Sequence, residues 1–296
     1  MTHIHPTATV ETERIGDGSS IGAYSRVGPE VALGAGCTVG EHVWLSGPME
    51  IGNRVEIAPL AYLEGPLRVE DGARIGPKVC VQGAGTALLE GAIIGAQATV
   101  WPGITVGKDA RVEPGSVVSK NVPARAVVAG NPAQIVGYCG TGPTPAKAEI
   151  AAAGAVTATE VEGVTLHQLP AHEDLRGNLT FGEAGRHVPF PVKRYFLTFD
   201  VASQEVRGEH AHRRLHQFLV CVHGRAHIVA DNGRRQAEFV LDRPHLGIHI
   251  PPMIWSVQYR FSGDAALLGL CSEYYDPEDY IRDYATFLAL ARKAGG

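Results

Sequence analysis

The amino-acid sequence predicts an all-β fold in two domains, a parallel β-helix followed by a small antiparallel barrel that a helix closes. Three observations predict it: a six-residue aliphatic repeat in the first half, a series of short strand-like segments in the second half, and a change of composition between them. The 296 residues exceed what one core usually organises in a repeat-plus-barrel chain, so two domains are expected.

Aliphatic residues occupy every sixth position from Ile15 to Val81, and Gly follows each of the first five. A helix places apolar residues every three to four positions, and a half-buried strand places them at every second one. A period of six suits a coil of short flat strands, with one inward aliphatic side chain per side and a small residue at each turn. Residues 1–137 are therefore predicted to form a left-handed parallel β-helix.

The repeat breaks after Val81 and resumes at Ile94, so residues 82–93 are expected to leave the coil as a loop. The closing stretches 103–107, 115–118 and 128–133 resemble the last coils of hexapeptide-repeat acyltransferases. That resemblance implies acetyl-CoA as acyl donor, bound along the late coils between neighbouring subunits, with Lys120 and Arg125 as candidate contacts to its phosphates. His42 is the candidate acid/base residue of this half.

One departure from those relatives concerns the pair Gly76-Pro77. In nucleotide-amino-sugar N-acetyltransferases of the kind fused to cupins, a Phe-Thr-Asn-Asp run follows such a pair, whereas here Lys-Val-Cys-Val follows. The β-helix is therefore interpreted either as an acetyltransferase or as a scaffold that only forms the trimer.

Residues 138–163 lose the repeat and gain small residues, which predicts a linker. Residues 164–296 are predicted to form the barrel or jelly roll, because short alternating segments are separated by Gly and Pro. Strands are expected over 192–201, 217–222, 226–229, 237–241, 247–250 and 265–271. The closing helix is expected to start with Asp276 as N-cap, Pro277 at the first position, and Glu278 and Asp279 in the first turn.

His210 and His212 are two residues apart in an extended segment, so their side chains should point to the same side. Metal-binding cupins add a carboxylate and a further His to such a pair, but here the run continues as Leu-His-Gln, and Trp255 stands where the last ligand would fall. His216 and His249 are the residues that could still complete a site. The incomplete ligand set predicts no bound metal.

Five stretches of the second half resemble the dTDP-4-keto-6-deoxyhexose 3,4-ketoisomerases, including the WxcM-like proteins that also carry an acetyltransferase domain. These stretches are 174–179, 189–194, 207–212, 246–255 and 272–284. The resemblance implies a metal-free cupin in which His212 is the base and His210 a second acid/base or orienting residue. It also implies Arg176, Arg194 and Arg207 as contacts to the diphosphate or the enediolate. Thr198 departs from several relatives, in which a tyrosine is expected.

The composition limits the classes of molecule that the protein is expected to bind. The net charge is -5 without a block of Lys or Arg, which argues against nucleic acid as a partner. Five scattered cysteines, no signal-like N-terminus and no apolar run of about 20 residues predict a cytoplasmic protein without a membrane partner. The expected ligands are dTDP-linked keto and amino sugars, and the expected assembly is a homo-oligomer, a trimer or a hexamer.

Three hypotheses for the function follow. In the first, the cupin moves a keto group from C4 to C3, and the β-helix acetylates the corresponding 3-amino sugar with acetyl-CoA. In the second, only the isomerase is active and the β-helix forms the trimer. In the third, the chain is a non-catalytic sugar-nucleotide binding protein.

Overall fold

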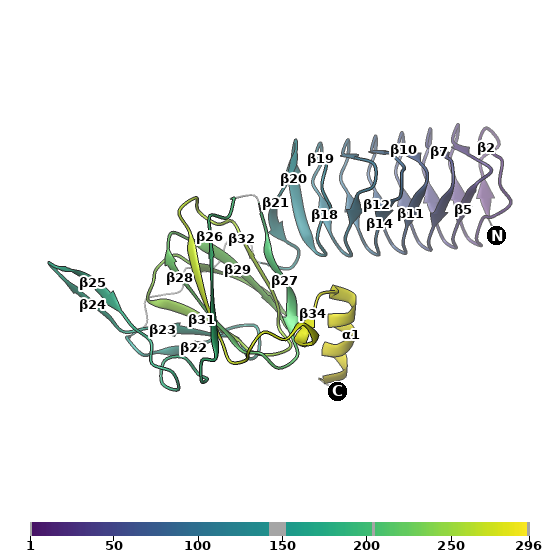
Figure 1. Cartoon of the computed structure of the whole chain (residues 1–296). Coiled ribbons are helices and arrows are strands. Elements are labelled where there is room, and N and C mark those ends of the chain that lie inside the picture. The colour runs from purple at the N-terminus through teal and green to yellow at the C-terminus, as the bar shows by residue number, and fades with distance from the viewer. Residues whose placement is uncertain (1, 142–151, 203–204, 295–296) are drawn as a thin grey trace. The chain divides into compact units, whose positions relative to one another are not determined.

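The computed structural model describes residues 2–141, 152–202 and 205–294. These residues divide into two compact units, 1–139 and 140–296, and each is described by itself. Part of the predicted linker, residues 142–151, lies outside the described residues. The predicted fold class, a β-helix followed by a barrel with a closing helix, is confirmed (Figure 1).

The first unit is a coil with three sides, each a sheet of short parallel strands. The first side contains β1 (His3–Ile4), β3 (Ser20–Ile21), β6 (Thr38–Val39), β9 (Glu56–Ile57), β12 (Arg74–Ile75), β15 (Ile93–Ile94), β18 (Arg111–Val112), β20 (Ala126–Gly130) and the antiparallel β21 (Ala133–Tyr138). The second side contains β2 (Thr9–Val10), β4 (Arg26–Val27), β7 (Trp44–Ser46), β10 (Tyr62–Glu64), β13 (Cys80–Val81), β16 (Thr99–Val100) and β19 (Val117–Val118). The third side contains β5 (Val31–Leu33), β8 (Met49–Ile51), β11 (Leu67–Val69), β14 (Thr86–Leu88) and β17 (Thr105–Val106).

The six-residue repeat supplies the interior of this coil. Ile21, Val27 and Leu33, one from each side, are all buried, as are the aliphatic residues that follow them at six-residue intervals. The glycines after these residues allow successive coils to lie close together. A Cβ on Gly22 would lie 2.6 Å from the carbonyl carbon of Gly40 in the next coil, so a side chain does not fit there.

The expected loop at residues 82–93 was wrong. The segment stays in the coil as β14, which pairs with β11 and β17 on the third side. The register shows one added residue: Leu67 pairs with Thr86, nineteen residues on, whereas Met49 pairs with Leu67, eighteen residues on. The extra residue is accommodated at the corner, where Ala84 and Gly85 have positive φ angles of 63° and 84°. A shift of one residue ends the six-residue count without removing the chain from the coil.

The second unit contains two antiparallel sheets that enclose a core. The six-stranded sheet has the order β22 (Val156–Ala158), β23 (Thr165–Gln168), β31 (Leu246–Ile250), β28 (Gln217–His223), β33 (Ala266–Cys271) and β26 (Arg194–Phe199). The five-stranded sheet has the order β30 (Gln236–Leu241), β29 (Ala226–Asp231), β32 (Trp255–Tyr259), β27 (Arg207–His212) and β34 (Tyr280–Ile281). A hairpin, β24 (Ala171–Asp174) with β25 (Gly177–Thr180), projects from the sheets (Figure 1).

Alternation along the strands decides which residues face the core between the two sheets. From the six-stranded sheet, Leu219 and Cys221 of β28 point into this core, where they meet Ile228 and Ala230 of β29. Phe218 and Val220 point the other way, into an outer cluster with Phe190. Each strand therefore has a fixed inner and outer face.

The expected closing helix begins later than predicted. Asp276 caps only a 3₁₀ helix over Pro277–Asp279, and the chain then extends into β34. The α-helix α1 spans Tyr284–Ala294, and Asp283 accepts a hydrogen bond from the Thr286 amide at its start. The helix is delayed because Asp279 is buried by contacts with residues 212–215 and Tyr280–Ile281 pair with β27. No helix among the described ranges is long and apolar enough to cross a membrane.

Candidate active site

The histidine pair lies at the end of β27 and faces the interior of the second unit. A bulge separates Gly208 from His210 in the pairing with β32, and Glu209 has a positive φ of 54°. The rings of His210 and His212 lie with centroids 4.8 Å apart and perpendicular planes. His210 pairs in register with Ser256, a buried serine whose hydroxyl has no hydrogen-bond partner among the described residues.

Strand β34 holds an aromatic ring against this pair. Tyr280 pairs in register with His212, and its ring centroid lies 4.9 Å from that of His210 and 4.3 Å from that of His212. The guanidinium of Arg282 lies over the Tyr280 ring, 4.1 Å from its centroid. Both imidazoles are thus fixed by packing.

Asp279 is a site residue that the sequence analysis missed. The residue is 3% exposed, and its Oδ2 lies 3.0 Å from His212 Nδ1. The backbone N–H groups of Arg214 and Leu215 donate to the same carboxylate at 2.9 and 3.3 Å. A capped helix start was the local interpretation of 276–279, and nothing local to that segment indicates a contact with a strand 67 residues away.

The opposite wall comes from the inner face of the six-stranded sheet. Arg194, Cys271 and Gln217 are neighbours in register across β26, β33 and β28. The side-chain nitrogen of Gln217 lies 3.3 Å from His212 Nε2, and Arg194 Nη2 donates to the Cys271 sulfur at 3.7 Å. Arg194 Nε is buried and has no partner among the described residues, so a donor remains for a bound molecule.

The electrostatics favour neutral imidazoles. Burial lowers the pKa of His212 to about 4, helped by the neighbouring His210 and by Arg194, while Asp279 acts in the opposite direction. Burial also lowers the pKa of His210, and Arg282 adds to this, while the carbonyl of Gly208 opposes it. His210 Nδ1 lies 2.8 Å from that carbonyl and so carries the proton, because a carbonyl only accepts. Near pH 7 both rings can accept a proton.

Two of the three arginines predicted for the site lie away from the histidine pair. Arg176 stands on the hairpin β24–β25, fully exposed and paired with Asp174 at 2.7 Å. Arg207 is exposed at the start of β27, opposite Gln258 in register. Of the three, the structure brings Arg194 alone to the wall that faces the histidine pair.

His216 and His249 do not join the pair. They stack on each other, with His216 Nδ1 3.0 Å from His249 Nε2, against Phe190 on the outer face of the six-stranded sheet. Trp255 also points away from the histidine pair and packs on Tyr284 and Phe287 of α1. Within the described part of the chain, no group of three or more His, Cys, Asp or Glu side chains is arranged to hold a metal ion.

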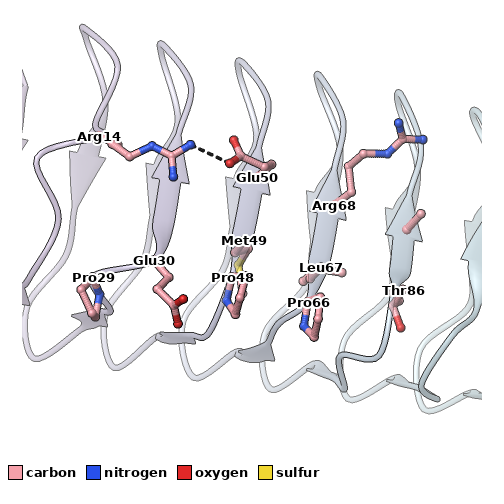
Figure 2. Close-up of a pocket in the computed structure, with 12 residues that line it drawn as sticks. Arg14, Pro29, Glu30, Pro48, Met49, Glu50, Pro66, Leu67, Arg68 and Thr86 are labelled. Atoms are coloured by element: carbon pink, nitrogen blue, oxygen red, sulfur yellow. Dashed lines mark hydrogen bonds and ion pairs between the residues drawn. The ribbon is translucent and has the colours of Figure 1, made fainter.

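The candidates in the first unit lie apart from the groove along its third side. His42 is exposed at a corner with φ of 54°, and its ring stacks on Tyr24. Lys120 is exposed beyond β19, and Arg125 donates to the Cys139 carbonyl at 2.9 Å. The groove, about 770 Å³, follows the third side and is bordered by none of the three; Figure 2 shows Arg14 reaching Glu50 across it.

Similarity to known proteins covers both units. Residues 162–292 match the family described as FdtA, WxcM-like, C-terminal. Residues 14–47 match the bacterial transferase hexapeptide family, and residues 89–120 match the hexapeptide repeat of succinyl-transferase. A TDP-4-oxo-6-deoxy-alpha-D-glucose-3,4-oxoisomerase from Aneurinibacillus thermoaerophilus is 40% identical over 114 residues, which are 38% of this chain and 82% of the relative.

Solved structures with similar folds include a 3,4-ketoisomerase from Helicobacter canadensis, at 35% identity and a TM-score of 0.43, covering 44% of this chain and 98% of that one. A sugar 3,4-ketoisomerase from Thermoanaerobacterium thermosaccharolyticum in complex with TDP has 34% identity and a TM-score of 0.44, covering 45% and 97%. The family and the 40% identical relative settle the membership of the second unit. The chain therefore belongs to the WxcM-like family of sugar 3,4-ketoisomerases, here with a hexapeptide-repeat unit in the same chain.

Proposed function

We propose that the second unit converts dTDP-4-keto-6-deoxyglucose into a dTDP-3-keto-6-deoxyhexose. The observation that carries this proposal is the pair of neutral imidazoles, His210 and His212, facing an arginine with an unpartnered buried donor. The 40% identical relative, named for the corresponding reaction on a TDP sugar, supports the choice of substrate.

The reaction moves two hydrogens and requires no net oxidation. A base removes the proton from C3, the electrons of that bond form the C3–C4 double bond, and the C4 carbonyl oxygen becomes an enediolate oxygen. The C3 hydroxyl then loses its proton and becomes the ketone, C4 takes up a proton at carbon, and the C4 oxygen takes up a proton and becomes the hydroxyl. A neutral imidazole can carry out both the removal and the return.

His212 is the proposed base and His210 the proposed second acid/base residue. Arg194 faces them with fixed donors and a permanent charge, which suits a developing enediolate oxygen. Contacts from Arg176 and Arg207 to the diphosphate are part of the same proposal, although both arginines are exposed in this chain.

Proton NMR of the intact chain with dTDP-4-keto-6-deoxyglucose tests the isomerase. We expect the C3 proton signal of the substrate to disappear and the signals of a 3-keto product to grow. Binding without turnover would favour the alternative of a sugar-nucleotide binding protein.

We also propose that the first unit transfers an acetyl group from acetyl-CoA to a dTDP-3-amino-3,6-dideoxyhexose. The amine nitrogen would attack the acetyl carbon, the C–S bond would break, and the thiolate would take up the proton that the nitrogen loses. The matches to hexapeptide transferase families support a transferase. Lys120, Arg125 and His42 are the candidate residues, and Lys120 is exposed near the late coils, where a phosphate could reach it.

One observation favours the scaffold alternative for the first unit. Residues 82–93 stay in the coil, so the described chain offers no protruding loop there that could cover an acceptor sugar. Calorimetric titration of the intact chain with acetyl-CoA distinguishes the acetyltransferase hypothesis from the scaffold hypothesis. Binding supports the transferase, and the absence of binding supports the scaffold.

A further inference from the structure

Each ring nitrogen of His212 has a polar partner on a different element. Nδ1 lies 3.0 Å from the Asp279 carboxylate, and Nε2 lies 3.3 Å from the side-chain nitrogen of Gln217. We propose that Asp279 and Gln217 are positioning residues that hold His212 with its proton on Nδ1, so that Nε2 is the atom that removes the substrate proton. This inference rests on the proposed isomerisation and assigns the reacting atom within it.

The carboxylate determines where the ring proton lies. An ionised carboxylate only accepts hydrogen bonds, so a neutral imidazole that faces one at Nδ1 carries its N–H there and its lone pair on Nε2. Asp279 cannot easily turn away, because the N–H groups of Arg214 and Leu215 donate to its oxygens and Arg213 N–H donates to its backbone carbonyl at 2.9 Å. The pair is buried, with His212 5% and Asp279 3% exposed.

The orientation of the Gln217 amide follows from the tautomer. Because Nε2 then offers only a lone pair, the amide group that complements it is the NH₂ group, as the 3.3 Å contact has it. After Nε2 takes up a proton, two donors would face each other. Gln217 therefore opposes protonation of the resting base, whereas Asp279 stabilises the imidazolium that forms during the reaction. The two residues have opposite effects on one ring.

Replacement of Asp279 by Asn tests the carboxylate. An Asn amide can donate to Nδ1, which moves the ring proton to Nε2 and removes the reacting lone pair. We expect kcat to fall about 10²- to 10⁴-fold, as on loss of a general base, with KM changed only a few-fold. Asp276→Asn is the matched control: Asp276 lies in the same segment, pairs with Arg214 at the surface, and Asn replaces Asp well as a helix cap. Its rate should stay within about twofold of wild type.

A direct measurement of the tautomer does not depend on the folding of a variant. In protein labelled with ¹⁵N-histidine, the His212 signals are assigned by their absence from His212→Asn. Wild type should show the Nδ1–H form at neutral pH, and folded Asp279→Asn should show the Nε2–H form. An Nε2–H form in wild type, or a wild-type kcat in folded Asp279→Asn, would overturn the inference.

Gln217→Glu provides an independent test, because a carboxylate opposite Nε2 stabilises the imidazolium. The acid limb of the pH profile of kcat/KM should move toward neutral pH by at least about one unit, as a close opposite charge does. An unmoved limb would count against the assigned role of Gln217. If wild type itself turns over no 4-keto sugar, the proposed isomerisation fails and the role of Nε2 as base fails with it, whereas the tautomer measurement separately tests whether Asp279 holds the ring proton on Nδ1.

Discussion

His210 and His212 lie so close together that their protonation states depend on each other. With ring centroids 4.8 Å apart, His212 buried and His210 half-buried, a proton on one ring makes a proton on the other unfavourable. The pair therefore holds at most one proton at neutral pH. One proton is also what the isomerisation requires the enzyme to hold between its removal from C3 and its return to C4.

Replacing His212 by Asn should remove most of the isomerase activity. Asn keeps a polar group of similar size and can still contact Asp279, but it supplies no base, so the rate should fall about 10²- to 10⁴-fold. Initial rates of 3-keto product formation measure this. His223→Asn is a suitable control, because His223 is exposed and pairs with Asp264 at the surface. Full activity in His212→Asn would remove His212 from the role of base.

The sequence predicted the histidine pair but not its partners. Side chains point alternately to the two faces of a strand, which is a local property. The spacing of His210 and His212 was therefore enough to place both side chains on one face. Asp279 reaches His212 because β34 pairs with β27, and Gln217 reaches it because the two sheets pack face to face. No local sequence pattern encodes either contact. Arg176 was grouped with the site because its motif resembles the family, yet it lies on the projecting hairpin.

At the scale of single elements, the outer face of the six-stranded sheet contains a second set of histidines. His216 and His249 stack, and His167 of β23 packs against His249 edge-on with centroids 6.3 Å apart. Burial lowers the pKa of all three, that of His249 to about 4. The His187 carbonyl opposes the change at His167, and the charge of Glu273 opposes it at His216.

This cluster should make the second unit sensitive to acid. Each of the three has a pKa in the folded protein below the ordinary value of 6.5, so below about pH 6.5 the unfolded chain binds more protons than the folded one. The stabilising contribution is complete above pH 6.5 and decreases as pH falls toward 4. Urea unfolding followed between pH 7.5 and 4.5 should show this loss, and His249→Gln should reduce its slope. An equal slope in His249→Gln would contradict the role of the cluster.

The elements themselves were predictable to different degrees. The six-residue repeat fixed the coil because every turn repeats the same steric requirement, an inward aliphatic residue followed by a close approach such as that at Gly22. The one-residue insertion before Thr86 was mistaken for a loop, because the count of six fails in both cases. The capping signals at Asp276 and Pro277 were correct for a turn but could not tell a 3₁₀ helix from an α-helix.

At the scale of the whole molecule, the three sides of the first unit differ in their outward residues. Along the first side these include Glu56, Arg74 and Arg111, and along the third side Glu50 and Arg68. The second side presents a row in register: Arg26, Trp44, Tyr62, Cys80, Thr99 and Val117. Arg26 lies over the Trp44 ring at 4.9 Å and pairs with Glu11, and Glu64 accepts a hydrogen bond from the Tyr62 hydroxyl at 3.3 Å at the end of the same strand.

A trimer or hexamer was expected from the sequence, and this second side is the surface we predict to join the copies. Trp44 and Tyr62 are neighbours in register and remain 39% and 40% exposed, a large apolar area in the middle of a flat side. Burying it against the neighbouring copies of a trimer would be favourable at roughly 25 cal/mol for each Å² of apolar surface. The charged first and third sides would lose hydration on such contact, which disfavours them.

The double variant Trp44→Arg, Tyr62→Arg tests this surface, because two adjacent guanidinium groups would oppose burial of the side. We expect wild type to sediment as a trimer or hexamer and the double variant to sediment as a smaller species at micromolar concentration, with the same far-UV circular dichroism. Ile93→Arg is the control, since Ile93 is similarly exposed, at 38%, but lies on the first side. A monomeric wild type would contradict the assembly. A double variant that keeps the wild-type mass, or an Ile93→Arg protein that dissociates, would show that the copies meet through a different side.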